Sequence, residues 1–219
     1  MFQRLSGYVF SSYFTSWKMS KRYQPASADY FCDDRSLILC NLAFRRDILV
    51  QEGCLFNDRL HYNEENLLLE QLKDKGYAMI YTPELSVFHI RRESMYGFVK
   101  QIAGSGTGRA IMTVMNPRLL MSIYVLPAVF VLYLVMLLMM HSSICLIPLF
   151  IYLIGTFTGS LLIVLKTSEK IFTVPLLMSM TFIAHGAYGC GYLKGIAMEL
   201  NKMLFENQNC RGFAVEEHR

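Results

Sequence analysis

Three apolar runs without a charged side chain constrain the fold of this chain more than any other feature of its sequence. They cover residues 119–140, 142–165 and 171–193, and each has 22 to 24 residues. At about 1.5 Å rise per residue, a helix of that length spans roughly 33 to 36 Å, more than the roughly 30 Å of a bilayer core. The runs therefore predict three closely spaced transmembrane helices. The third contains His185 and six Gly, Ala or Pro residues, so a broken or interfacial segment is the alternative there.

The charge distribution predicts how these helices are oriented. The composition is 53% hydrophobic with a mean hydropathy of +0.32, and most of the charge lies in the first 118 residues. Positive charge beside a span marks the cytoplasmic side and suits lipid phosphates. We therefore expect a multi-pass protein of the plasma or inner membrane whose N-terminal half is cytoplasmic. The basic residues close to the first run are Arg91, Arg92, Lys100, Arg109 and Arg118.

The N-terminal half carries signals for alternating short elements. Asn63 is a good N-cap, two glutamates follow it in the first turn, and Gly76 is the expected helix stop, so a helix is predicted from residue 63 to about residue 75. Residues 78–81 and 85–88 read as short strands around a turn at Pro83. The apolar residues 37–40 predict a buried strand or the start of a helix.

A second helix is expected just before the first apolar run. Residues 94–103 have apolar side chains at helical spacing, which suits a helix that lies on the membrane surface. The three glycines at 104, 106 and 108 lack the strand and the Lys-Ser/Thr of a phosphate-binding loop, so they predict a flexible joint. The glycines at 186, 189, 191 and 195 are expected to let helices approach closely.

One ordered set of short motifs runs through residues 41–109. It consists of Asn41–Arg46, Gly53–Asp58, Glu64–Leu68, Lys75–Tyr77, Tyr81–Pro83, Val87–His89, Arg91–Arg92, Phe98–Gln101 and Gly108–Arg109. In this order the motifs resemble the C-terminal half of a membrane-bound family 2 glycosyltransferase. The segment His185–Gly191 is similar to the membrane tails of polysaccharide-building members.

The resemblance implies a fold class and a domain order. It implies an α/β domain, a partial GT-A fold with a Rossmann-like αβα sandwich, over residues 1–92. An interfacial helix and Gly-rich joint would occupy residues 93–118. An all-α transmembrane bundle of about three helices would occupy residues 119–193, and a polar tail residues 194–219.

The resemblance also implies an activity and a catalytic base. Family members transfer a sugar from a nucleotide-sugar with inversion at the anomeric carbon, and a carboxylate removes the proton from the acceptor hydroxyl. Glu65 stands where the family usually has Asp, and Glu64 stands at the preceding acid. The longer side chain of Glu shifts the carboxylate outward, and misplacement by about 1 Å can cost a hundredfold in rate. The alternative for both residues is a solvated helix N-terminus.

Other site residues follow from the same resemblance, each with an alternative. Arg91, Arg92 and Arg109, with Gln101 in the interfacial-helix motif, are expected to contact phosphate of the nucleotide or of a lipid-linked acceptor. The alternative for the arginines is anchoring at the membrane surface. His89 stands where some members place a metal-facing His, and the alternative is a strand-end His bonded to backbone.

His185, Asp33 and Asp34 are three further candidate residues. His185 is a functional candidate because it lies inside an apolar segment, and the favoured alternative is a buried hydrogen bond within the bundle. Asp33 and Asp34 are interpreted as loop acids because the metal motif of the family, an Asp-x-Asp, falls much earlier in its members.

The expected partners follow from what the matching region lacks. Only about 40 residues precede it, so the chain is expected to be truncated or split from a partner chain that carries the donor-binding half. Mg or Mn would be held through that half. The ligands would be a nucleotide-sugar, a lipid-linked or polysaccharide acceptor and membrane lipids, with no nucleic acid. The rival interpretation is a non-catalytic membrane subunit or remnant of such an enzyme.

Overall fold

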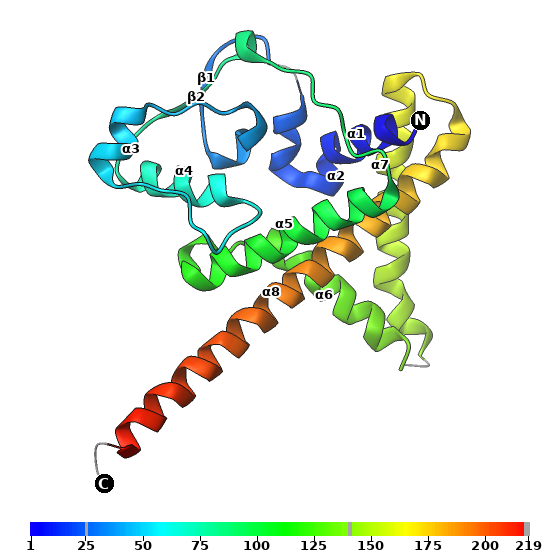
Figure 1. The fold of residues 1–219 in the computed structure, drawn as a ribbon. Coiled ribbons are helices and arrows are strands. Elements are labelled where there is room, and N and C mark those ends of the chain that lie inside the picture. Colours follow the sequence, from blue (N-terminus) through cyan, green and yellow to red (C-terminus); the bar gives the residue numbers. More distant parts are fainter. Residues whose placement is uncertain (25, 140–141, 217–219) are drawn as a thin grey trace.

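Helices dominate the computed structural model, which describes residues 1–24, 26–139 and 142–216, the last of these from 206 onward as backbone (Figure 1). The α-helices are α1 (Phe2–Ser11), α2 (Tyr13–Ser16), α3 (Arg46–Glu52), α4 (Glu64–Asp74), α5 (Met95–Met115), α6 (Ser122–Leu137), α7 (Ile147–Thr167) and α8 (Val174–Glu216). Short 3-10 segments connect them: η1 (Trp17–Tyr23), η2 (Asp34–Ser36), η3 (Leu39–Asn41), η4 (Pro83–Leu85), η5 (Pro117–Leu119), η6 (Ser143–Leu146) and η7 (Ile171–Thr173).

The expected α/β domain, a partial GT-A fold, is wrong. Within the described residues the only sheet is the antiparallel pair of β1 (Tyr30–Cys32) and β2 (Met79–Tyr81), in which Phe31 lies opposite Ile80. A Rossmann-like sandwich needs several parallel strands between layers of helices, and this pair provides none. The fold that the motif resemblance implied for the N-terminal half is therefore not the one that it adopts.

The residue patterns of the N-terminal half predicted one strand correctly and two other elements incorrectly. The expected strand at 78–81 corresponds to β2. The strand expected at 85–88 is absent, because η4 occupies its start and the following residues are exposed, with no strand beside them in the described structure. Residues 37–40 form neither a strand nor an α-helix; η3 begins within them. A short apolar run cannot by itself distinguish these outcomes.

Helix α4 confirms the helix predicted after Asn63, but its N-terminus is built differently. Asn63 has a left-handed backbone, with φ of 62°, and its side chain does not cap the helix. Instead its amide Nδ2 donates to the carbonyl oxygen of Ser105 in α5 at 2.8 Å. Gly76 follows the helix with φ of 87°, a conformation that favours glycine. The first turn of α4 is thereby attached to α5.

The flexible joint expected at residues 104–108 is also wrong. Helix α5 continues through these glycines to Met115, and the Ser94 side chain accepts a hydrogen bond from the Gly97 N–H at its start. Glycine lowers helix propensity by about 1 kcal/mol per residue, so tertiary contacts must maintain the helix here. Those contacts come mainly from α8, which crosses α5 (Figure 1).

Glycines make the crossing of α5 and α8 possible. A Cβ at Gly106 would meet the backbone carbonyl of Tyr188, and one at Gly191 would meet that of Ala103. The Thr107 hydroxyl donates to the Gly191 carbonyl at 2.9 Å across the same contact. The expected close packing is therefore confirmed for Gly191, and also for Gly189 and Gly195, whereas Gly186 faces open space.

The three apolar runs form helices of unequal length. The first contains α6, whose 16 residues cover only about 24 Å. Among the described residues, two helices are long and apolar enough to cross a membrane, Ser143–Thr167 and Ile171–Phe205. The α-helix of the second, α8, runs without a break through the third run, so the alternative of a broken segment there is wrong.

The main core lies where the N-terminal helix meets this bundle. Leu5 and Val9 of α1 pack with Phe98 and Ile102 of α5 and with Leu177 of α8. In Figure 1, β1, β2, α3 and α4 lie on one side of α5 and α6 lies on the other. The first turn of α4 and the middle of α5, which Asn63 joins, therefore meet at the junction between the N-terminal half and the apolar helices.

Candidate functional site

The carboxylates in the first turn of α4 lie inside this junction. Glu65 is only 6% exposed, so the alternative of a solvated helix start is wrong for it. Glu64 is half-buried, and its Oε2 atom is shielded from solvent without a hydrogen-bond partner. The pairing of Asn63 with α5 holds this turn in place. The two candidate catalytic residues are thus adjacent, with Glu65 the more enclosed.

Burial changes the acid strength of Glu65. Desolvation raises the pKa of its carboxyl group, and the charge of Glu64 raises it further. The guanidinium groups of Arg22 and Arg109 act in the opposite direction. A carboxyl whose pKa lies above its usual value is better suited to exchange a proton near neutral pH than an exposed one.

Arg22 connects three segments around these carboxylates. It donates to the backbone carbonyls of Asp34 and Arg35 at 2.6 and 2.7 Å, and to the Asn66 side-chain oxygen at 2.7 Å. Asn66 is fully buried in α4. Hydrogen bonds from a charged donor are stronger than neutral ones, so Arg22 holds η1, η2 and α4 in a fixed arrangement. Sequence reasoning assigned no role to Arg22.

Arg109 is the second guanidinium group at the junction. It lies on α5, is only 3% exposed, and stacks over the Tyr124 ring with 4.3 Å between its Cζ atom and the ring centroid. Among the described residues, no carboxylate forms an ion pair with it. Its burial rules out the alternative of membrane-surface anchoring. Its expected contact with phosphate stays a prediction.

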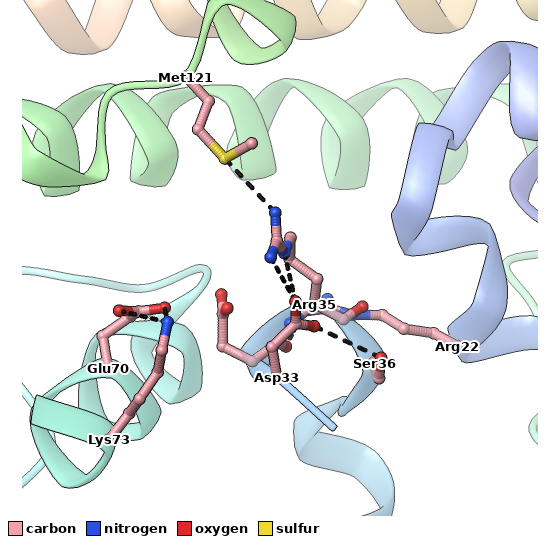
Figure 2. Close-up of polar contacts among 8 residues, drawn as sticks. Arg22, Asp33, Arg35, Ser36, Glu70, Lys73 and Met121 are labelled. Atoms are coloured by element: carbon pink, nitrogen blue, oxygen red, sulfur yellow. Dashed lines mark hydrogen bonds and ion pairs between the residues drawn. The ribbon is translucent and has the colours of Figure 1, made fainter. Parts of the chain in front are cut away.

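A cavity of about 160 Å³ opens beside Arg109. Figure 2 shows Arg35 reaching toward Met121, and Glu70 paired with Lys73 to one side. Arg35 also forms an ion pair with Asp33, which accepts a hydrogen bond from the Arg35 N–H as the cap of η2. The residues that line the cavity are Asp34, Arg35, Glu70, Lys73, Arg109, Arg118, Leu119, Met121 and Tyr124.

The sequence did not predict the burial of Asp34, which lines this cavity. Asp33 is a loop acid as expected, but Asp34 is buried at 4% exposure. Desolvation, followed by its hydrogen bond with Glu70, raises the pKa of Asp34 to about 6. Asp34 and Glu70 are far apart in the chain, and no local pattern indicated that they meet.

The remaining expected phosphate contacts do not gather at the cavity. Arg91 lies between the rings of Phe10 and Tyr23, with its Cζ atom 4.7 and 4.6 Å from their centroids, so it acts as a packing residue of the N-terminal helices. Arg92 is exposed, and Gln101 is half-buried on α5. Neither lines the cavity beside Arg109.

His89 lies in an exposed, irregular segment after η4. No group of three or more His, Cys, Asp or Glu side chains that could hold a metal ion occurs in the part of the chain that is described. His89 therefore belongs to no such group there, and a hard cation needs several oxygen ligands.

His185 supports the favoured interpretation of a buried hydrogen bond. Its Nδ1 atom lies 2.9 Å from the Tyr152 hydroxyl, and the rings of Phe14 and Tyr152 contact it at 5.8 Å between centroids. This cluster joins α2, α7 and α8 inside the bundle.

Comparison of the chain with protein-family models, with curated proteins and with solved structures found no significant match. The resemblance to family 2 glycosyltransferases therefore rests on the motifs quoted above.

Proposed function

We propose that this chain is the membrane-bound, acceptor-side part of a sugar transferase. The observation that carries the proposal is the burial of Glu65 within the electrostatic influence of Arg22 and Arg109, at the position where the motif set expects the catalytic base. Glu65 would remove the proton from the acceptor hydroxyl. Arg109 would offset negative charge on a phosphate that leaves or remains attached to the acceptor.

The proposal includes a location and a partner. Two long apolar helices support attachment to a membrane. We propose a multi-pass arrangement with the N-terminal half at the cytoplasmic face, supported by the basic residues before the first apolar run. The nucleotide-sugar and its Mg or Mn would be bound by a donor half that this chain does not contain.

One observation favours a second candidate function, a non-catalytic membrane subunit of such an enzyme. Glu65 is only 6% exposed and does not line the cavity beside Arg109, so substrate would reach it only after a rearrangement or through a partner. Such a subunit would hold the acceptor while another chain performs the transfer.

The test is Glu65→Gln in the complete enzyme, with its donor half. General-base catalysis contributes about a hundredfold to ten-thousandfold, so we expect a loss of at least about a hundredfold in sugar transfer from a panel of nucleotide-sugars to membrane lipid or polymer. The matched control is Glu84→Gln, because Glu84 is exposed on η4 and forms no ion pair among the described residues.

The result of the Glu65→Gln test distinguishes the two candidate functions. Gln removes a buried charge without changing the shape of the side chain, so the variant should melt at or above the temperature of the unmodified protein. Full turnover by Glu65→Gln would reject Glu65 as the base and leave the non-catalytic subunit. Nucleotide-sugar binding by the isolated chain, measured by titration calorimetry, would reject both the non-catalytic subunit and the separate donor half.

A further inference from the structure

The cavity beside Arg109 joins parts of the chain that lie far apart in sequence. Its walls come from η2, α4, α5, η5 and the start of α6, and its volume of about 160 Å³ is well above the roughly 10–15 Å³ that one water needs. It therefore has room for a small polar group.

The basic residues that line the cavity supply hydrogen-bond donors, and the charge of Arg109 is balanced only at longer range, by Asp34 and Glu65. Arg35 pairs with Asp33 and Lys73 pairs with Glu70, but Arg109 and Arg118 form no ion pair among the described residues. Arg109 is 3% exposed, and a buried guanidinium without a paired anion is costly. Arg118 is exposed on η5. Arginine forks bind phosphate oxygens well, so an anion such as phosphate suits these basic residues.

The acidic residues of the cavity offer acceptors. Asp34 and Glu70 both line the cavity. Carboxylate oxygens accept hydrogen bonds from hydroxyl groups but repel phosphate. A ligand that fits both the basic and the acidic residues must carry a phosphate and several hydroxyls.

The cavity lies next to the start of the apolar helix α6. Leu119, Met121 and Tyr124 line it where α6 begins. Farther along α6, Leu126 and Val129 are more than half exposed, as expected of side chains that face lipid. A hydrocarbon chain attached to the ligand would reach the lipid beside α6.

We propose that this cavity binds the head of a lipid that carries a phosphate and a sugar or another polyol. The phosphate would lie at Arg109 and Arg118, and the hydroxyls at Asp34 and Glu70. The inference rests on the proposed function for the role of this lipid, which would be the acceptor of the sugar. The same chemistry occurs in free sugar phosphates, and the experiment below distinguishes the two sources.

The test measures retention of lipids by the full chain in phosphatidylcholine nanodiscs, by native mass spectrometry. Phosphatidylinositol supplies a phosphodiester with a polyol, and phosphatidylethanol supplies a phosphodiester of the same charge without hydroxyls. We expect phosphatidylinositol to be retained best, phosphatidylethanol less, and phosphatidylcholine least.

Two variants test the basic and the acidic residues of the cavity separately. Arg118→Gln should weaken retention of both anionic lipids by about tenfold, whereas Lys100→Gln, which removes the same charge from an exposed position on α5, should change it little. Glu70→Ala should abolish only the preference for phosphatidylinositol, and retention of phosphatidylethanol should stay equal or increase. Both Arg118 and Glu70 lie near the surface, so folding should tolerate these changes.

Three results would overturn the proposal: equal retention of phosphatidylinositol and phosphatidylcholine, equal effects of Arg118→Gln and Lys100→Gln, or an equal loss of both anionic lipids in Glu70→Ala.

Glucose 1-phosphate added at millimolar concentration shows whether the site binds only the lipid or also free sugar phosphates. Displacement of phosphatidylinositol supports a site that also takes free sugar phosphates, and no displacement supports a site for the lipid alone. Because binding is measured without a donor and without turnover, its failure is distinct from a failure of the Glu65→Gln test.

Discussion

At the scale of single residues, Asp34 makes the stability of the protein depend on pH. Its pKa of about 6 lies above its ordinary value of 3.8, so the folded state binds this proton more tightly than the unfolded state. The resulting stabilisation is complete below about pH 4 and is lost as pH rises through 6. A shift of this size corresponds to roughly 3 kcal/mol at most.

We therefore expect Asp34→Asn to melt several degrees above the unmodified protein at pH 8 and close to it at pH 4, measured by thermal unfolding in detergent. Asn cannot ionise, so it avoids the buried charge at high pH. Asp74→Asn, at the exposed end of α4, is the control and should follow the unmodified protein at both values. A difference between Asp34→Asn and the unmodified protein that is the same at pH 4 and pH 8 would contradict this explanation.

At the scale of elements, the crossing of α5 and α8 depends on backbone contacts at glycine. A Cβ at Gly191 would meet the backbone of Ala103, which cannot move as a flexible side chain can. We expect Gly191→Ala to destabilise the protein by about 1–3 kcal/mol, visible as a lower melting temperature. Gly186→Ala on the same helix should melt at or above the unmodified protein, because Gly186 faces open space and Ala favours helix. Equal effects of the two changes would show that helix propensity, rather than the contact with Ala103, determines the change in melting temperature.

At the scale of the whole molecule, two ion pairs indicate how the apolar helices lie relative to the N-terminal half. Arg4 pairs with Glu169 at 2.7 Å, which places the C-terminal end of α7 beside α1. Arg59 pairs with Glu199 of α8, which places that part of α8 beside the loop before α4. The 21 residues of α7 cover about 32 Å, enough to reach the opposite face of a bilayer.

These contacts predict the labelling of single cysteines by a membrane-impermeant maleimide, in a background without the six native cysteines. Ser143→Cys, before α7, should react in intact cells. Ser86→Cys and Leu200→Cys should react only after lysis, because Ser86 lies in the N-terminal half and Leu200 follows the residue that pairs with Arg59. Reaction of position 200 in intact cells would instead show that α8 crosses the membrane.

The sequence by itself determined the features that depend on neighbouring residues. The helix after Asn63 and its stop at Gly76 follow from side-chain type and spacing, and the helices within the apolar runs follow from length and hydropathy. The importance of Glu64 and Glu65 was suggested by their motif, and the burial of Glu65 agrees with a special environment, although its catalytic role is untested.

Only the tertiary structure decided the features that depend on distant partners. Residues 104–108 are helical because α8 packs against glycines that alone would favour a joint. Tyr30–Cys32 forms a strand because Met79–Tyr81 pairs with it, and no further strand extends that pair into an α/β sheet in the described structure. The charged cavity exists because the fold brings together Asp34, Glu70 and Arg109 from three segments. Secondary-structure propensity depends on neighbouring residues, so it does not predict contacts between distant ones.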